Sequence, residues 1–349
     1  MKYLFNFLVL FFILGNTVIG VAQEDTAREQ SNALFSDAQP LKLKLQYSIK
    51  DLRKKTNDST YIKSTLLAKT AVGWDSLPID IRARGNFRRD HCYYVPVKVK
   101  IDKKKAKGTV FEKNRKLKLV LPCLMEADKN DFVLKEYLAY SFFELISPYY
   151  YKTRLVDIEF LEEKGGRIKI HRLRGFFIED SDKVEDRLKG KEVNRKVHPM
   201  QQDALNAIRN DLFQFMIGNT DYSTKQGHNE KLFYLDAKYI CLPYDFDMSG
   251  LVNASYSSVS NVQNLSKSIS EVTQRAYKGY QRDRALVEQV RREYLDHEGE
   301  ILKKLREMKL EFESEQQYQA AEQFLAGFFN ILKNDARFEK QVVKRARPN

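Results

Sequence analysis

Between residues 41 and 121 the chain repeatedly alternates apolar residues with charged or polar ones. The clearest runs are residues 41–49 (LKLKLQYSI), 77–84 (LPIDIRAR), 94–101 (YVPVKVKI) and 116–121 (KLKLVL), with a weaker run at 60–68. Successive side chains of a strand point to opposite faces, so a period of two predicts strands with one buried face. The first part of the chain is therefore expected to be rich in β-strands.

The remaining sequence predicts helices and further strands. The expected helices are residues 131–146 and 201–217 with most of residues 272–343, and the expected strands are residues 154–163, 168–179, 231–235 and 239–242. Gly165 and Gly166 are placed to form the turn between two of these strands. Residues 180–199 are polar and predict a loop with some helical content.

The N-terminus has the pattern of an export signal. Lys2 precedes an apolar run at residues 3–14, and the small residues Gly20 and Ala22 fit a signal peptidase site. The alternative is a membrane anchor, but the run is shorter than the roughly 20 residues that span a bilayer. We expect a signal peptide at residues 1–22 and a polar linker at 23–40. The mature protein would then be exported, periplasmic or extracellular, without a stable membrane span.

The charge of the chain favours an anionic partner. Its 60 Lys and Arg exceed 47 Asp and Glu, which gives a net charge of +13, and such an excess attracts a nucleotide, an acidic protein or a glycan. The sequence contains no zinc-ligand spacing, helix-turn-helix signature or aromatic-basic RNA-binding strand. Only the net charge therefore supports nucleic-acid binding, which predicts association that weakens steeply with salt.

Cys92, Cys123 and Cys241 are the cysteines of the chain. In an oxidising compartment one pair can form a disulfide and leave one thiol, or all three can be buried and free. The sequence does not decide between these arrangements.

Polar residues cluster at the edges of the hairpin expected within residues 216–250. Asp221 follows the apolar end of a helix, Asn229 opens one short strand, and Asp245 and Asp247 close the next. A carboxylate and an amide oxygen can hold Mg²⁺, and another carboxylate can orient a hydroxyl. The structural alternatives are an Asx-turn or helix C-cap at Asp221 and a metal-free strand end at Asp245 and Asp247.

Several short motifs resemble the spore coat protein H (CotH) family of atypical kinases. PYDFDMSG at residues 243–250 is similar to the family's PWDFD-like motif. IRARGNFRRD at 81–90 contains its RGN strand end, and YVPVKVKI at 94–101 is similar to its lysine strand. The helix expected at 131–146 follows in the family's order. The resemblance spans about residues 41–250.

This resemblance implies an α+β, two-lobed atypical protein-kinase-like fold. The β-rich N-lobe would comprise residues 41–179, and the mainly helical C-lobe residues 180–349. The implied reaction is Mg²⁺-dependent transfer of the γ-phosphoryl group of ATP to a protein hydroxyl. Asp221 would orient the acceptor, Asn229 and Asp245 would hold the metal, and Asp247 would either contact the metal or cap the following turn.

Three further residues are candidates for contact with the nucleotide. Lys98 and Arg84 would approach its phosphates. Glu136, on the expected helix, would pair with Lys98. Each also has an ordinary structural interpretation as a charged residue on a solvated face. No GxxxxGK[ST] or GxGxxG loop is present, so a glycine-rich phosphate loop is not expected.

Export conflicts with the use of ATP, because ATP is scarce outside a bacterial cell. A different phosphoryl donor or a secretory lumen that contains ATP would resolve the conflict. The alternative function is a catalytically inactive kinase-like protein that binds an envelope glycan or protein.

Overall fold

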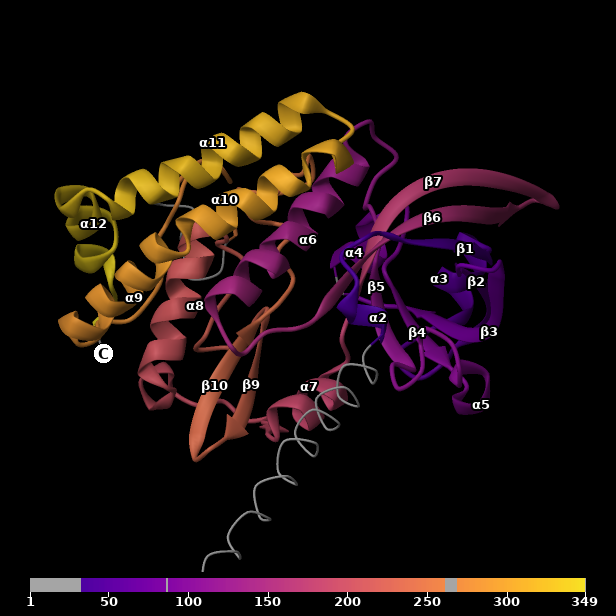
Figure 1. Ribbon diagram of the computed structural model, residues 1–349, viewed down its shortest axis with the longest axis horizontal. Helices are drawn as coiled ribbons and strands as arrows, with labels where there is room; N and C mark the ends of the chain where they lie inside the picture. The colour runs from indigo at the N-terminus through magenta and orange to yellow at the C-terminus, as the bar shows by residue number, and fades with distance from the viewer. Residues whose placement is uncertain (1–32, 86, 261–268, 349) are drawn as a thin grey trace, which may run out of the picture.

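The computed structural model describes residues 33–85, 87–260 and 269–348. The expected signal peptide and residues 23–32 of the expected linker lie outside this part of the chain. Within it, seven strands form a closed barrel in the order β1-β2-β3-β4-β5-β7-β6 (Figure 1). Their bounds are β1 Leu41–Tyr47, β2 Ile62–Lys69, β3 Trp74–Ala83, β4 Val97–Ile101, β5 Lys116–Val120, β6 Thr153–Lys164 and β7 Arg167–Ile178.

A parallel pair of strands closes the barrel. β1 runs parallel to β6, with Leu41 opposite Val156 and Tyr47 opposite Glu162, whereas the other neighbouring strands are antiparallel. Residues of β1 alternate between buried and more exposed positions, as the period of two in the sequence predicts. The inward-facing apolar side chains form one core inside the barrel.

Short helices cover the ends and surface of the barrel. They are α2 Ala33–Ser36, α3 Ile49–Lys55, α4 Phe87–His91 and α5 Lys103–Ala106. The first of these lies in the expected linker, yet its Leu34 is fully buried in the barrel core. The hydroxyl of Ser48 accepts a hydrogen bond of 3.2 Å from the backbone N–H of Asp51, so α3 begins where the sequence pattern extended the first strand.

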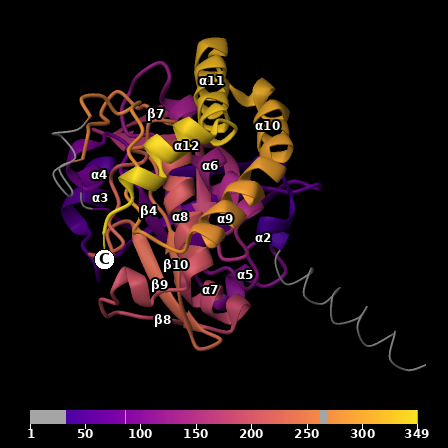
Figure 2. The same cartoon turned by 90° about the vertical axis from the view of Figure 1, so that its left-hand side faces the viewer.

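The longer helices pack outside the barrel around a second apolar core. They are α6 Lys129–Ile146, α7 Ser181–Leu188, α8 Ala204–Ile217, α9 Arg284–Asp296, α10 Glu298–Glu307, α11 Glu315–Leu332 and α12 Asp335–Gln341. Helix α6 packs on β7, and α8 contacts both α9 and α11 (Figure 2). Single 3₁₀ turns cover Pro199–Gln201, Lys309–Glu311 and Val343–Arg345.

A small second sheet lies beside α8. It consists of β8 Lys191–Glu192, β9 Glu230–Leu235 and β10 Lys238–Pro243, in the order β10-β9-β8 (Figure 1). The hairpin β9–β10 corresponds to the two short strands expected from the sequence. Its register pairs Glu230 with Pro243, so Asn229 and Tyr244 follow at the same end of the hairpin.

The predicted two-lobed atypical protein-kinase-like α+β fold is wrong. The structure has a closed seven-stranded mixed barrel with helices packed outside it, not a β-rich N-lobe followed by a helical C-lobe. Strands β6 and β7 were expected as two strands of an N-lobe, and they instead close a barrel by joining β1 and β5. Pairing between strands so far apart in sequence leaves no mark on local periodicity.

The cysteines follow the first of the two arrangements open from the sequence. Cys92 and Cys123 form a disulfide, and Cys241 is a buried free thiol. In the part of the chain that the structure covers, no helix is long and apolar enough to cross a membrane.

Candidate functional site

The turn after α8 presents Asp221 at the end of the β9–β10 hairpin. Gly218 ends α8 in the left-handed conformation, with φ of 62°. The side chain of Asn219 then accepts a hydrogen bond of 2.9 Å from the backbone N–H of Asp221. The Asx-turn considered for Asp221 is thus made by Asn219, which leaves the carboxylate of Asp221 for other contacts.

Three side chains donate hydrogen bonds to the carboxylate of Asp221. The ring of His228 and the hydroxyl of Ser260 lie 3.3 Å and 2.9 Å from Oδ1, and the amide of Asn229 lies 3.0 Å from Oδ2. Burial alone would raise the pKa of Asp221, but these hydrogen bonds lower it below its usual value. Asp221 is therefore an ionised carboxylate at neutral pH.

Lys278 fixes the backbone on both sides of Asp221. Its Nζ donates hydrogen bonds of 2.8 Å and 2.5 Å to the carbonyl oxygens of Thr220 and Tyr222. The side chain is only 2% exposed, and burial, with the nearby charge of Arg347, lowers the pKa of Lys278 to about 8. Sequence reasoning missed this residue, because an isolated lysine gives no local sign that it contacts a distant turn.

Asn229 and Asp245 lie at the same end of the β9–β10 hairpin, on its two opposite arms. The backbone N–H of Tyr244 donates to the carbonyl of Asn229 at 3.0 Å. The amide nitrogen of Asn229 donates to Asp221, and its Oδ1 has no hydrogen bond among the described residues. The carboxylate of Asp245 likewise has no hydrogen bond or ion pair within the described ranges, although its N–H donates to the hydroxyl of Tyr140 at 2.9 Å. Two oxygen-bearing groups thus remain available for a ligand.

The backbone of both residues is left-handed. Asn229 has φ of 54° and Asp245 has φ of 66°. Asn and Asp tolerate this region better than other residues with a Cβ, yet it is sparsely populated and costs free energy. A strained backbone at an unpaired carboxylate is typical of a site shaped for function rather than for stability.

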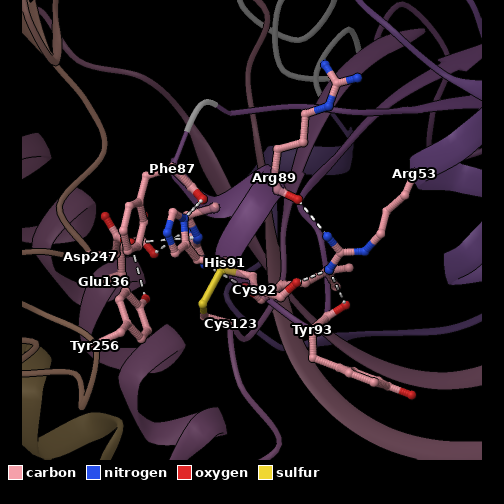
Figure 3. The surroundings of a disulfide bond; sticks show 12 residues. Arg53, Phe87, Arg89, His91, Cys92, Tyr93, Cys123, Glu136, Asp247 and Tyr256 are labelled. Carbon is pink, nitrogen blue, oxygen red and sulfur yellow. Dashed lines mark hydrogen bonds and ion pairs between the residues drawn. A yellow bond between two sulfur atoms is a disulfide. The ribbon is translucent and has the colours of Figure 1, made fainter.

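Arg88 connects two of the other candidate residues. Its guanidinium lies 3.4 Å from Oε2 of Glu136 and 3.6 Å from Oδ2 of Asp247, and Tyr256 donates its hydroxyl to Asp247 at 3.1 Å. Figure 3 shows Glu136, Asp247 and Tyr256 grouped beside helix α4. Glu136 therefore pairs with an arginine that the sequence did not single out, and not with the lysine expected as its partner.

Both carboxylates of this group have raised pKa values. Burial is the main cause for Glu136 and for Asp247, and the nearby charge of Asp245 adds to it. The positive charge of Arg88 partly offsets this effect. Asp247 is thus turned toward a buried arginine, whereas Asp245 has no partner among the described residues.

Cationic side chains gather at the neighbouring ends of β4 and β5. Lys98 lies 3.6 Å from the carboxylate of Asp180, and Lys118 is its register partner on β5. The Nζ of Lys118 lies 5.4 Å from the ring centroid of Tyr244. Burial, with the charge of Arg84, lowers the pKa of Lys118 to about 8. Lys118 was missed in the sequence because it resembles the solvated face of a strand.

Arg84 and Asp245 belong to the same neighbourhood. Tyr244 follows β10, and its pKa is raised by the negative charge of Asp245 and lowered by the positive charge of Arg84. The same holds for Tyr140, whose hydroxyl contacts the backbone of Asp245. The site therefore combines cationic groups of the barrel with a carboxylate that has no ion pair within the described ranges.

Among the residues that the structure describes, no group of three or more His, Cys, Asp and Glu side chains is arranged to hold a metal ion. Mg²⁺ takes few ligands from the protein when phosphate oxygens and water complete its octahedral shell. The oxygen donors that fit such an ion here are the carboxylate of Asp245 and Oδ1 of Asn229.

A buried acid that contacts the residue after Asp221 predicts a pH-dependent stability. Burial, with the charge of Glu230, raises the pKa of Asp211 from 3.8 to about 7. The folded protein then keeps a proton that the unfolded chain releases, so this residue lowers stability as pH rises from about 4 to about 7. In Asp211→Asn we expect the urea midpoint, relative to wild type, to rise between about pH 5 and about pH 8. A constant difference across this range contradicts the assignment.

No protein-family model matches the sequence. A search of curated proteins found no match either.

Proposed function

We propose that this site transfers a phosphoryl group from a Mg²⁺-bound nucleotide, ATP in the first instance, to a protein hydroxyl. The observation that carries the proposal is the carboxylate of Asp245, which has no hydrogen bond or ion pair to any residue that the structure describes and whose backbone φ is 66°. It lies at the same hairpin end as Asn229, and the charges of Asp245 and Arg84 both act on the pKa of the neighbouring Tyr244. A carboxylate left without a protein partner beside cationic groups suits a metal-bound phosphate. The motifs that resemble the CotH family support the same reaction.

Asp245 and Asn229 are the residues that would hold the metal. Both present an oxygen without a hydrogen bond from any described residue, and carboxylate and amide oxygens are ligands that Mg²⁺ accepts. When bound, Mg²⁺ would neutralise charge on the phosphates of the donor. Asp247 contributes indirectly, because Arg88 and Tyr256 already contact its carboxylate.

Asp221 is the residue that would orient the acceptor hydroxyl. Its Oδ1 accepts hydrogen bonds from His228 and Ser260, whereas Oδ2 accepts only the one from Asn229 among the described side chains. A carboxylate oxygen accepts two hydrogen bonds, so Oδ2 can take a further one from a substrate hydroxyl. An ionised Asp221 can then accept the hydroxyl proton as the new bond to phosphorus forms.

Arg84 and Lys118 are the cations best placed for the phosphates. Neither has an ion pair among the described residues, whereas Lys98 lies 3.6 Å from Asp180 and is partly neutralised. Bringing a phosphate to Lys118 would raise its lowered pKa, because an anion stabilises the charged form. Lys98 would then act by holding Asp180 rather than by direct contact.

A second candidate is a catalytically inactive protein that binds an envelope glycan or protein. The observation in its favour is the engagement of Asp247 by Arg88, which removes one of the expected metal ligands. The two candidates differ in nucleotide binding, which only the first requires.

A Mg²⁺-dependent thermal shift with ATP tests the proposal. At about 100 times the dissociation constant, a ligand adds about 2.7 kcal/mol of stability, which corresponds to a rise in melting temperature of several degrees. We expect this rise in wild type, its absence without Mg²⁺, and its loss in Asp245→Ala.

Asp236→Ala is the matched control. Asp236 is an exposed aspartate of the same hairpin, and its φ of 49° is also left-handed. The control should have the same backbone strain and keep the thermal shift. If no nucleoside triphosphate shifts the melting temperature of wild type, the enzymatic proposal is contradicted and the catalytically inactive binding protein is the remaining candidate.

A further inference from the structure

Helix α4 lies between the disulfide and the proposed site and carries Arg88. The backbone N–H of Cys92 donates to the carbonyl of Arg88 at 3.0 Å, at the end of the helix. Cys92 is then bonded to Cys123, and the N–H of Tyr93 donates to the carbonyl of Cys123 at 2.7 Å. Figure 3 shows the disulfide with Glu136 and Asp247 on one side and Arg53 on the other.

Helix α3 holds the opposite side of α4. The guanidinium of Arg53 donates a hydrogen bond of 2.7 Å to the carbonyl of Arg89 and also contacts the carbonyl of Cys92. Arg89 in turn donates to the carbonyl of Thr56 at 3.1 Å, just after α3. Helix α4 is therefore held by hydrogen bonds to α3 and, through Cys92, by the disulfide to the segment after β5.

The disulfide fixes both Arg88 and the carbonyl that orients it. Nη2 of Arg88 donates to the carbonyl of Leu121 at 2.7 Å, two residues before Cys123. The remaining nitrogens of the guanidinium are directed to Glu136 and Asp247. The disulfide therefore sets the position of α4, which carries Arg88, and of the segment that contains the carbonyl of Leu121.

Arg88 matters to the site because it separates two buried carboxylates. Glu136 and Asp247 are 2% and 5% exposed, and Arg88 is 7% exposed. Without the guanidinium these groups would face each other and Asp245 without a compensating charge, which is costly in a buried setting. The turn that contains Asp245 and Asp247 would then be expected to shift.

We infer that Arg88 is a positioning residue of the proposed phosphoryl-transfer site and that the Cys92–Cys123 disulfide holds it in place. The inference rests on the proposed role of Asp245. Arg88 acts through Asp247, which lies two residues after Asp245 in the same turn. The complete site then forms only in the oxidised protein.

The redox step is ordinary thiol–disulfide exchange. The thiolate of one cysteine attacks a disulfide of a thiol oxidoreductase or of oxidised glutathione, and the second cysteine then displaces that partner as a thiol. The two cysteines lose two protons and two electrons, and the partner disulfide is reduced to two thiols. Cys92 and Cys123 are 0% and 3% exposed, so replacing them is a cleaner test than adding a reductant.

Activity of the full chain gives the first test. In Arg88→Met we expect phosphoryl transfer to fall about 10²-fold, because small misplacements of reacting groups cost about this much. Arg88→Lys keeps a charge and should recover part of the rate. In the double variant Cys92→Ala/Cys123→Ala we expect a fall in kcat of about 10-fold or more with a smaller change in KM for ATP. Cys241→Ala, which removes the free thiol, is the control.

Hydrogen exchange gives a second test that needs no activity. The N–H of Ser249 donates to Phe246 at 3.0 Å and that of Gly250 to Gly218 at 3.1 Å. We expect faster exchange at residues 246–250 in Arg88→Met and in the double cysteine variant, with strand β2 unchanged.

The two tests separate the inference from the proposed function. If wild type transfers no phosphoryl group but residues 246–250 exchange faster in the variants, the function fails and the positioning role stands. Wild-type exchange at residues 246–250 in both variants would overturn the inference, whatever the activity. An unchanged kcat in the double variant would contradict the claim that the disulfide holds Arg88 in place.

Discussion

Asp221→Asn is expected to lower phosphoryl transfer by about 10²–10⁴-fold, the usual contribution of a positioned general base. An amide keeps the shape of the side chain and can still accept the hydrogen bonds from His228 and Ser260. It has no negative charge with which to orient a hydroxyl and take its proton. The loss should therefore appear in kcat rather than in the binding of nucleotide.

The measurement is transfer of labelled γ-phosphoryl from ATP to the protein itself or to an added acceptor. The melting temperature should change little, because the substitution removes only the hydrogen bond from Asn229. Its loss costs about 1 kcal/mol of stability. Asp236→Asn, in the exposed turn of the same hairpin, should transfer at the wild-type rate. Transfer by Asp221→Asn at more than about a third of the wild-type rate contradicts the role assigned to Asp221.

Lys278→Met is expected to destabilise the protein by about 2–5 kcal/mol. The Nζ of Lys278 is the hydrogen-bond donor to the carbonyls of Thr220 and Tyr222, and both residues are 1% exposed. Each buried carbonyl left without a donor costs about 1–3 kcal/mol. Methionine fills similar space, so the expected loss comes from the missing donor rather than from a cavity.

Urea unfolding at neutral pH measures this effect. Lys303→Met is the matched control, because Lys303 is 71% exposed and its nearest carboxylate oxygen, on Glu307, is 3.9 Å away. The control should change stability by less than about 0.5 kcal/mol. A Lys278→Met protein as stable as the control would show that water satisfies the two carbonyls and that the turn does not depend on Lys278.

The local elements of this fold could be predicted because they have simple periods. Strands β1 and β4 alternate apolar and charged residues, and helices α6 and α8 carry apolar residues on several faces. The hairpin β9–β10 follows from two short apolar runs on either side of a turn. Each of these patterns reflects burial of one short segment, which the sequence records directly.

The arrangement of these elements could not be predicted in the same way. The parallel pairing of β1 with β6 closes the barrel, and its partners are more than a hundred residues apart. Nothing in either strand specifies the other, because both offer the same alternation of apolar and charged residues. The motifs that resemble the CotH family therefore led to a fold that the structure does not have.

The candidate site shows the same division between local and distant information. Asp221 and Asn229 lie eight residues apart between α8 and β10, and the structure joins them by a hydrogen bond of 3.0 Å. Arg88 and Lys278 act on that site from α4 and from the segment before α9. Their roles depend on contacts with distant segments, so no local pattern marks them.

A crystal structure with Mg²⁺ and a non-hydrolysable ATP analogue tests the central claim most directly. The account predicts one Mg²⁺ at about 2.0–2.1 Å from a carboxylate oxygen of Asp245 and from Oδ1 of Asn229. The phosphates should face Arg84 and Lys118. A nucleotide bound elsewhere, with the carboxylate of Asp245 free of metal, would contradict the account.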